Sequence, residues 1–229
     1  MIGDKVLAIR ERIKAVCQRV GRNPQEIALI GITKYATAET IKEAIDAGLH
    51  DIGENRVQDA AQKFRILDSL NAQSTRHLVG HLQTNKAKQA VQLFDVIQSV
   101  DSLKLAQELQ KHAGESGRPA KIFIEVNTSK EEQKYGLSSS EVIPLIEKIL
   151  TLKNIQIFGL MTIASQTEDQ SIVRNNFREL KSLFDKVKKD FKGQERLFLQ
   201  HLSMGMSNDF EIAIEEGSNM VRVGSAIFG

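Results

Sequence analysis

Cysteine and tryptophan are nearly absent from this chain of 229 residues, which has one cysteine, Cys17, and no tryptophan. A single cysteine cannot close an intramolecular disulfide, and it argues against a zinc site built from cysteine and histidine. We therefore expect a protein of a reducing compartment, the cytoplasm, without a metal centre.

The sequence also lacks an excess of one charge and a long apolar run. Lys and Arg number 31 against 29 Asp and Glu, a net charge of +2, so we expect neither a nucleic-acid surface nor a membrane-binding one. No apolar stretch is long enough to span a bilayer. Residues 1–20 place apolar side chains three and four apart among charged ones, which predicts an amphipathic helix and not a signal peptide.

A short apolar stretch, 27–34, ends in a lysine. Its composition predicts a strand buried on both faces, as in a parallel sheet. Lys34 then lies at the carboxyl end of the strand, where α/β sheets and barrels carry their chemistry. In a water-poor site a lysine loses its proton more easily and can form a Schiff base with an aldehyde. The alternative is that Lys34 is the first solvated residue of a loop.

Stretches with strand character alternate with helical patterns along the whole chain. The predicted strands cover 27–34, 50–55, 76–80, 95–100, 120–126, 155–160, 196–202 and 220–223. Eight such units at this chain length predict one domain, 1–229, folded as a single (β/α)₈ TIM barrel with an additional N-terminal helix. An open, doubly wound sheet is the alternative, because periodicity does not prove closure.

Polar and small residues collect after the predicted strands. Two small-residue loops, 203–208 and 224–225, follow the last two strands, and in barrels these loops commonly bind a phosphate through backbone N–H groups. Each glycine or serine alone fits an ordinary turn or helix cap, whereas the two adjacent loops together favour a phosphate site. The glycines that permit close approach and the serines that supply hydroxyls are Gly205, Gly224, Ser203, Ser207 and Ser225.

A Schiff-base lysine across a barrel mouth from a phosphate site favours pyridoxal 5′-phosphate (PLP) as the cofactor. A class I aldolase, in which Lys34 attacks a sugar-phosphate carbonyl, is the rival interpretation. His81 and His201 fit structural, hydrogen-bonded histidines. Met204 and Met206 fit a packed wall better than a chemical role.

Several longer motifs identify a family. They cover 31–34, 53–58, 77–86, 125–128, 134–137, 159–162, 202–210 and 221–229. With them the chain resembles the pyridoxal phosphate homeostasis protein family, a single-domain relative of the alanine racemase barrel among the fold-type III PLP proteins. One departure is Arg76, where the family usually has an aromatic residue.

The resemblance implies that Lys34 holds PLP as a Schiff base, that Asn55 lies beside the ring and that Arg222 approaches the pyridine nitrogen. It further implies phosphate contacts from a set of five residues, namely Ser203, Gly224 and Ser225 together with the backbone near Met204 and Ser207. It assigns no role to Lys134 or His81.

The implied function is intracellular PLP, that is vitamin B6, and amino-acid homeostasis by a monomeric carrier or buffer without efficient catalysis. Its recipients are expected to be PLP-dependent apoenzymes. We also expect no length after 220–223 for the further domain that gives alanine racemase its second base. A PLP-dependent amino-acid racemase of low activity and the aldolase stay open as alternatives.

Overall fold

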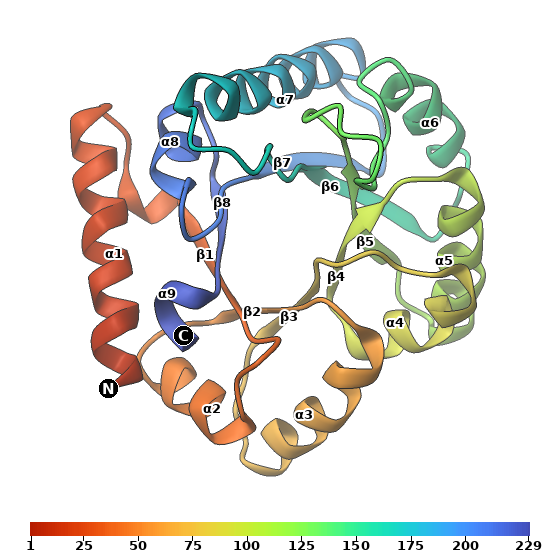
Figure 1. Cartoon of the computed structure of the whole chain (residues 1–229). Helices are drawn as coiled ribbons and strands as arrows, with labels where there is room; N and C mark the ends of the chain where they lie inside the picture. Colours follow the sequence, from red (N-terminus) through yellow and green to blue (C-terminus); the bar gives the residue numbers. More distant parts are fainter.

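The computed structural model describes residues 1–229 and shows eight parallel strands closed into a barrel (Figure 1). The strands are β1 (Ala28–Ile32), β2 (Asp51–Glu54), β3 (Thr75–Leu78), β4 (Val96–Val100), β5 (Ala120–Glu125), β6 (Ile155–Met161), β7 (Leu197–Ser203) and β8 (Met220–Val223). The barrel closes where β1 pairs with β8, from Ala28 opposite Met220 to Gly31 opposite Val223. The predicted barrel is confirmed, and the open sheet is wrong because β1 and β8 are not edges.

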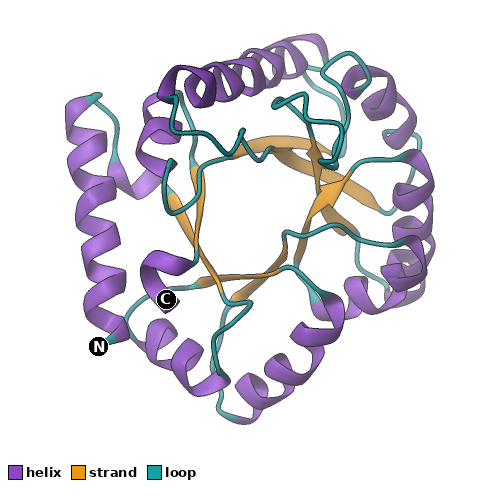
Figure 2. Cartoon of the chain, viewed as in Figure 1, coloured by secondary structure: helices purple, strands orange, loops and turns teal.

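Helices surround the barrel (Figure 2). They are α2 (Ala38–Asp46), α3 (Val57–Ser69), α4 (Ala87–Leu93), α5 (Leu103–Ser116), α6 (Val142–Ile149), α7 (Gln170–Asp190), α8 (Phe210–Glu215) and α9 (Ser225–Phe228), with 3₁₀ turns at Pro24–Glu26 and Thr84–Lys86. None of the helices has the length and apolarity needed to cross a membrane.

The predicted N-terminal helix is α1 (Ile2–Arg19), which lies outside the ring against α2, α8 and α9 (Figure 1). Its buried residues Val6, Ile9, Ile13, Val16 and Cys17 share one apolar cluster with side chains of β1 and β8. Because β1 and β8 form the closing seam, α1 covers the outside of that seam.

The main core lies between the strands and the ring of helices, in a cluster of 44 buried side chains. The apolar cluster that faces inward is much smaller and holds five buried residues, Ile30, Val96, Phe123, Met161 and Met220. A TIM barrel is a packed core and not a pore, so polar side chains occupy part of this interior.

Helix α9 was not predicted, because four residues are too short for a helical pattern to be visible in the sequence. The expected loop at 224–225 therefore turns directly into helix after β8. Otherwise the predicted strands all form, with boundaries shifted by one or two residues at most ends.

Candidate functional site

Lys34 lies in a turn two residues beyond the end of β1, and that turn is firmly anchored. The buried side chain of Glu54, the last residue of β2, accepts hydrogen bonds at Oε1 from Thr33 Oγ1 (2.7 Å) and Lys63 Nζ (2.8 Å). Lys63 Nζ also donates to the backbone oxygen of Thr33 (2.6 Å). The residue before Lys34 is thus held by two neighbouring elements.

The Lys34 side chain itself is exposed, with Nζ 4.9 Å from the centroid of the Tyr35 ring. The expectation of a water-poor lysine is therefore wrong. The physical reason is that Lys34 projects from a turn beyond the strand and not from the strand itself, so the barrel wall does not enclose it.

Lys34 borders a cavity of about 810 Å³ at the carboxyl ends of β1, β6, β7 and β8. The same cavity is lined by Ser207, Arg222, Gly224 and Ser225. The Gly224 N–H donates to Ser207 Oγ (3.2 Å), which ties the loops after β7 and β8 together. The structure thus brings together five of the eight predicted site residues, from both ends of the chain.

Asn55 and Met204 do not line this cavity. Asn55 follows β2 at the same end of the barrel, and its backbone packs so closely on Gly80 that a Cβ at Gly80 would lie 2.4 Å from the Asn55 oxygen. Met204 is fully buried in the main core, and its N–H donates to the Met220 oxygen (3.1 Å). That N–H is therefore already paired.

Ser203, the first residue of the expected loop at 203–208, does not line the cavity either. It ends β7 with its side chain inside the barrel, fully buried. Its hydroxyl accepts a hydrogen bond from Arg222 Nη1 (2.7 Å) and donates to Gln98 Oε1 (2.7 Å). The hydroxyl predicted to meet a phosphate thus supports Arg222 in this structure, because the last residue of β7 has its side chain directed inward.

Arg222, on β8, is a buried cation at the base of the cavity, with 4% of its surface exposed. Besides Ser203, its guanidinium donates through Nη2 to the Thr162 oxygen (2.8 Å). Burial lowers the pKa of Arg222 to about 10, while the nearby carboxyl groups of Asp209 and Glu125 act in the opposite direction. At neutral pH it remains a charged donor.

Glu125, the last residue of β5, does not line the cavity, but its carboxyl is a buried counter-charge to Arg222 that the sequence did not single out. It is 6% exposed, and its Oε2 atom has no hydrogen-bond partner. Burial is the main cause that raises the pKa of Glu125 to about 7; the Asp101 carboxyl acts in the same direction and Arg222 in the opposite one. The visible signal was a carboxylate next to the end of the predicted strand at 120–126, inside the motif at 125–128.

His81 and Lys134 both have partners at this end of the barrel. The His81 ring stacks on Tyr135 with 3.7 Å between centroids, and its Nδ1 lies 3.7 Å from Asp101 Oδ2. Lys134 Nζ, which borders the cavity, donates to Glu131 Oε1 (2.7 Å) and to the Ala164 oxygen (2.9 Å). Lys34 therefore has fewer competing contacts than Lys134.

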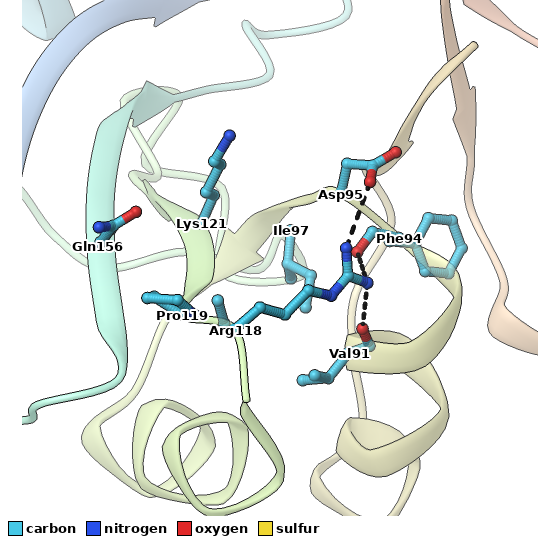
Figure 3. Close-up of a pocket in the computed structure, with 9 residues that line it drawn as sticks. Val91, Phe94, Asp95, Ile97, Arg118, Pro119, Lys121 and Gln156 are labelled. Atoms are coloured by element: carbon cyan, nitrogen blue, oxygen red, sulfur yellow. Dashed lines mark hydrogen bonds and ion pairs between the residues drawn. The ribbon is translucent and has the colours of Figure 1, made fainter. Parts of the chain in front are cut away.

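A second cavity, of about 270 Å³, lies at the opposite end of the strands (Figure 3). One of its two cations, Arg118, donates to the backbone oxygens of Val91 (2.8 Å) and Phe94 (3.5 Å) and pairs with Asp95. The other is Lys121, whose Nζ lies 5.2 Å from the centroid of the Phe158 ring. No cluster of three His, Cys, Asp or Glu side chains could hold a metal ion.

Comparison with known proteins identifies the family of this chain. The family model for the N-terminal domain of alanine racemase matches residues 6–229. A pyridoxal phosphate homeostasis protein of Aquifex aeolicus is 39% identical over 99% of this chain and 96% of its own length. The protein of that name in Escherichia coli is 33% identical over 100% and 96%. This chain belongs to the pyridoxal phosphate homeostasis protein family.

Solved structures support the family and the fold. PipY of Synechococcus elongatus, determined with PLP bound, is 34% identical with a TM-score of 0.86, and each chain is covered in full. Alanine racemase of Clostridium difficile has a TM-score of 0.77 at 16% identity, covering 99% of this chain and 56% of that one. The racemase likeness shows the shared barrel fold.

The buried carboxyl of Glu125 predicts a pH-dependent stability. The ordinary pKa of a glutamate side chain is 4.5. Between this pH and about 7, the folded chain keeps a proton on Glu125 that the unfolded chain has released. Stability is therefore lost as the pH rises through this window, by about 3 kcal/mol in total. Glu125→Gln should remove this loss, so its stability relative to the wild type should rise from pH 4.5 to 8 in urea unfolding.

Glu141→Gln is the matched control, because hydrogen bonds from Ser138 lower the pKa of that surface carboxyl. The free energy of unfolding of Glu141→Gln, relative to that of the wild type, should not change between pH 5 and 8. If the free energy of unfolding of Glu125→Gln relative to the wild type also stayed constant over this range, the raised pKa of the buried Glu125 carboxyl would be contradicted.

Proposed function

We propose that this chain binds PLP at the mouth of the barrel, holds it as a Schiff base on Lys34 and serves as a carrier or buffer in PLP and amino-acid homeostasis. The single observation that carries the proposal is the cavity that joins Lys34, the buried Arg222 and the two small-residue loops. The name shared by the relatives and the PLP in the PipY structure support it.

The groups around the cavity match the three reactive parts of PLP. Lys34 offers a primary amine to the aldehyde, and Arg222 offers a charged donor to the pyridine nitrogen. Ser207, Gly224 and Ser225 offer hydroxyl and backbone donors to the phosphate. We also propose that Asn55, which follows β2 at the same end of the barrel, lies beside the ring of bound PLP. When bound, PLP supplies an aldehyde that condenses with amines and a ring that withdraws electrons.

Arg222 supports a carrier more than a catalyst. Arginine has donors and no acceptor and keeps its charge, so it favours an unprotonated ring nitrogen, which withdraws electrons weakly. A racemase also needs proton-transfer groups on both faces of the bound amino acid. Tyr35 adjoins Lys34 in the same turn, and Tyr135 is stacked on His81. We therefore assign no efficient catalysis to this site.

The remaining parts of the proposal concern the cell. A single domain over 1–229, acting as a monomer in the cytoplasm, would pass PLP to PLP-dependent apoenzymes. Exposure of Lys34 agrees with this use, because incoming amines and water can reach the bond that must be broken for release.

Lys34 should be the covalent anchor. PLP added to the protein should produce the visible absorbance of a Schiff base, and borohydride reduction followed by peptide mapping should find the pyridoxyl group on Lys34. Lys34→Ala should abolish both signals, whereas Lys134→Ala should keep the absorbance. A pyridoxyl group mainly on Lys134 would overturn the assignment, and a protein that shows no absorbance with PLP would instead favour an aldolase or a simple binding module.

The phosphate should bind at the loops after β7 and β8. A hydrogen bond to a charged partner contributes about 1.5–3 kcal/mol, so Ser225→Ala or Ser207→Ala should weaken PLP binding about tenfold or more. Pyridoxal, which has no phosphate, serves as the control ligand in the same titrations. Pyridoxal should bind poorly to the wild type, and neither substitution should lower its affinity further. If both ligands lost the same affinity, the serines would not be contacts of the phosphate.

Amino-acid turnover should be slow. The PLP-loaded protein, incubated with L-alanine and other amino acids, should form D-isomers and keto acids far below ordinary enzyme rates of about 1 s⁻¹. Chiral chromatography of the products measures this directly, with a known racemase as the positive control. Turnover at or above that rate would show a racemase or transaminase and not a carrier.

A further inference from the structure

A continuous chain of hydrogen bonds runs through the interior of the barrel from Arg222 to Asp51. Arg222 Nη1 lies 2.7 Å from Ser203 Oγ, and Ser203 Oγ lies 2.7 Å from Gln98 Oε1. Gln98 Nε2 lies 3.0 Å from His77 Nδ1, and His77 Nε2 lies 3.1 Å from Asp51 Oδ1. The five residues come from β8, β7, β4, β3 and β2, so only the closed barrel brings them together.

The direction of every bond in this chain is fixed by chemistry. Arginine can only donate, so Ser203 Oγ accepts from Arg222 and its own proton goes to Gln98 Oε1. The amide nitrogen of Gln98 then faces His77 and donates to Nδ1. His77 must consequently accept at Nδ1 and carry its proton on Nε2, which donates to Asp51. The chain begins at a cation and ends at a carboxylate.

The middle of the chain is sealed from water. Ser203 and Gln98 are fully buried, and His77 is 2% exposed. A buried polar group left without its partner costs about 1–3 kcal/mol, so removing one member leaves its neighbours unsatisfied and free to turn. The other contact of Gln98 Nε2 is the sulfur of Met220 at 3.4 Å, a weak acceptor. Little else inside the barrel fixes the orientation of the Gln98 amide.

We propose that Gln98 is a positioning residue, which acts through Ser203 to hold the Arg222 guanidinium where it meets the pyridine nitrogen of PLP. His77 and Asp51 set the orientation of the Gln98 amide from the far end of the chain. This inference rests on the proposed function. It also gives Ser203 a role at the ring of the cofactor and not at the phosphate.

The chain of bonds is tested first in the protein without PLP. In a ¹⁵N NMR spectrum of the histidine rings, His77 should carry its proton on Nε2 alone, with its signal assigned by loss in His77→Gln. Gln98→Glu replaces the donor to Nδ1 with an acceptor, so His77 should gain a second proton, on Nδ1. A wild-type ring protonated on Nδ1 alone would overturn the inference, as would a His77 signal unchanged in Gln98→Glu.

The effect on the cofactor is tested by titrating PLP and 1-deazapyridoxal phosphate, which has carbon in place of the ring nitrogen. Gln98→Leu and Ser203→Ala should each weaken PLP binding about tenfold, since Arg222 loses its fixed position. The same variants should bind the deaza compound as the wild type does, because that ligand has no nitrogen for Arg222 to meet.

Ser99→Ala is the matched control. Ser99 is the neighbour of Gln98 on β4, equally buried, and its hydroxyl has no hydrogen-bond partner. Ser99→Ala should leave both affinities unchanged. Equal losses for PLP and the deaza compound in Gln98→Leu would mean a general structural role and overturn the inference, and so would no loss for either. A wild type that binds neither ligand would overturn the proposed function itself, while the NMR result would still decide the chain of bonds.

Discussion

The arrangement at the mouth of the barrel depends on burying one positive charge, the guanidinium of Arg222. An unpaired buried charge costs several kcal/mol, so the surrounding strands must supply acceptors and counter-charges. Ser203 from β7 and the backbone oxygen of Thr162 after β6 accept its hydrogen bonds. Glu125 and Asp209 supply negative charge nearby. Each partner comes from a different element, so the interactions of the Arg222 guanidinium link several elements that border the cavity.

The junction between β7 and β8 shows how such a site leaves room for a ligand. These strands share a single ladder pair, Ser203 opposite Met220. Beyond it the chains are linked by the Arg222 N–H, which donates to the Gly205 oxygen (2.9 Å), and by the bond from Gly224 to Ser207. Gly205 has a φ of +97°, and a Cβ there would lie 2.6 Å from that of Ala213. Only glycine fits there, and the loops diverge from regular pairing where the phosphate is proposed to bind.

The two ends of the proposed PLP site differ in how tightly the protein holds them. Arg222 is buried and supported by a chain of bonds across the barrel, whereas Lys34 is exposed on a turn. The proposed combination of a rigid ring site and an accessible covalent link would suit a protein that holds a cofactor and also releases it. An enzyme that used the same cofactor for proton transfer would gain from the reverse, a shielded lysine and positioned bases on both faces.

Much of this could be predicted from the sequence alone, because local pattern determines it. The alternation of apolar strands and amphipathic helices predicted the eight units, and Lys34 and the two small-residue loops were visible as polar or flexible residues after strands. The sequence pattern could not show that the barrel closes, because closure depends on the pairing of β8 with β1. It also could not show that Lys34 is exposed, because this depends on how the turn after β1 leaves the barrel. Nor could it show that Ser203 faces inward to Gln98, or that Glu125 is buried without a partner. Those facts depend on register and shear, which place side chains far apart in sequence against one another only once the barrel has closed.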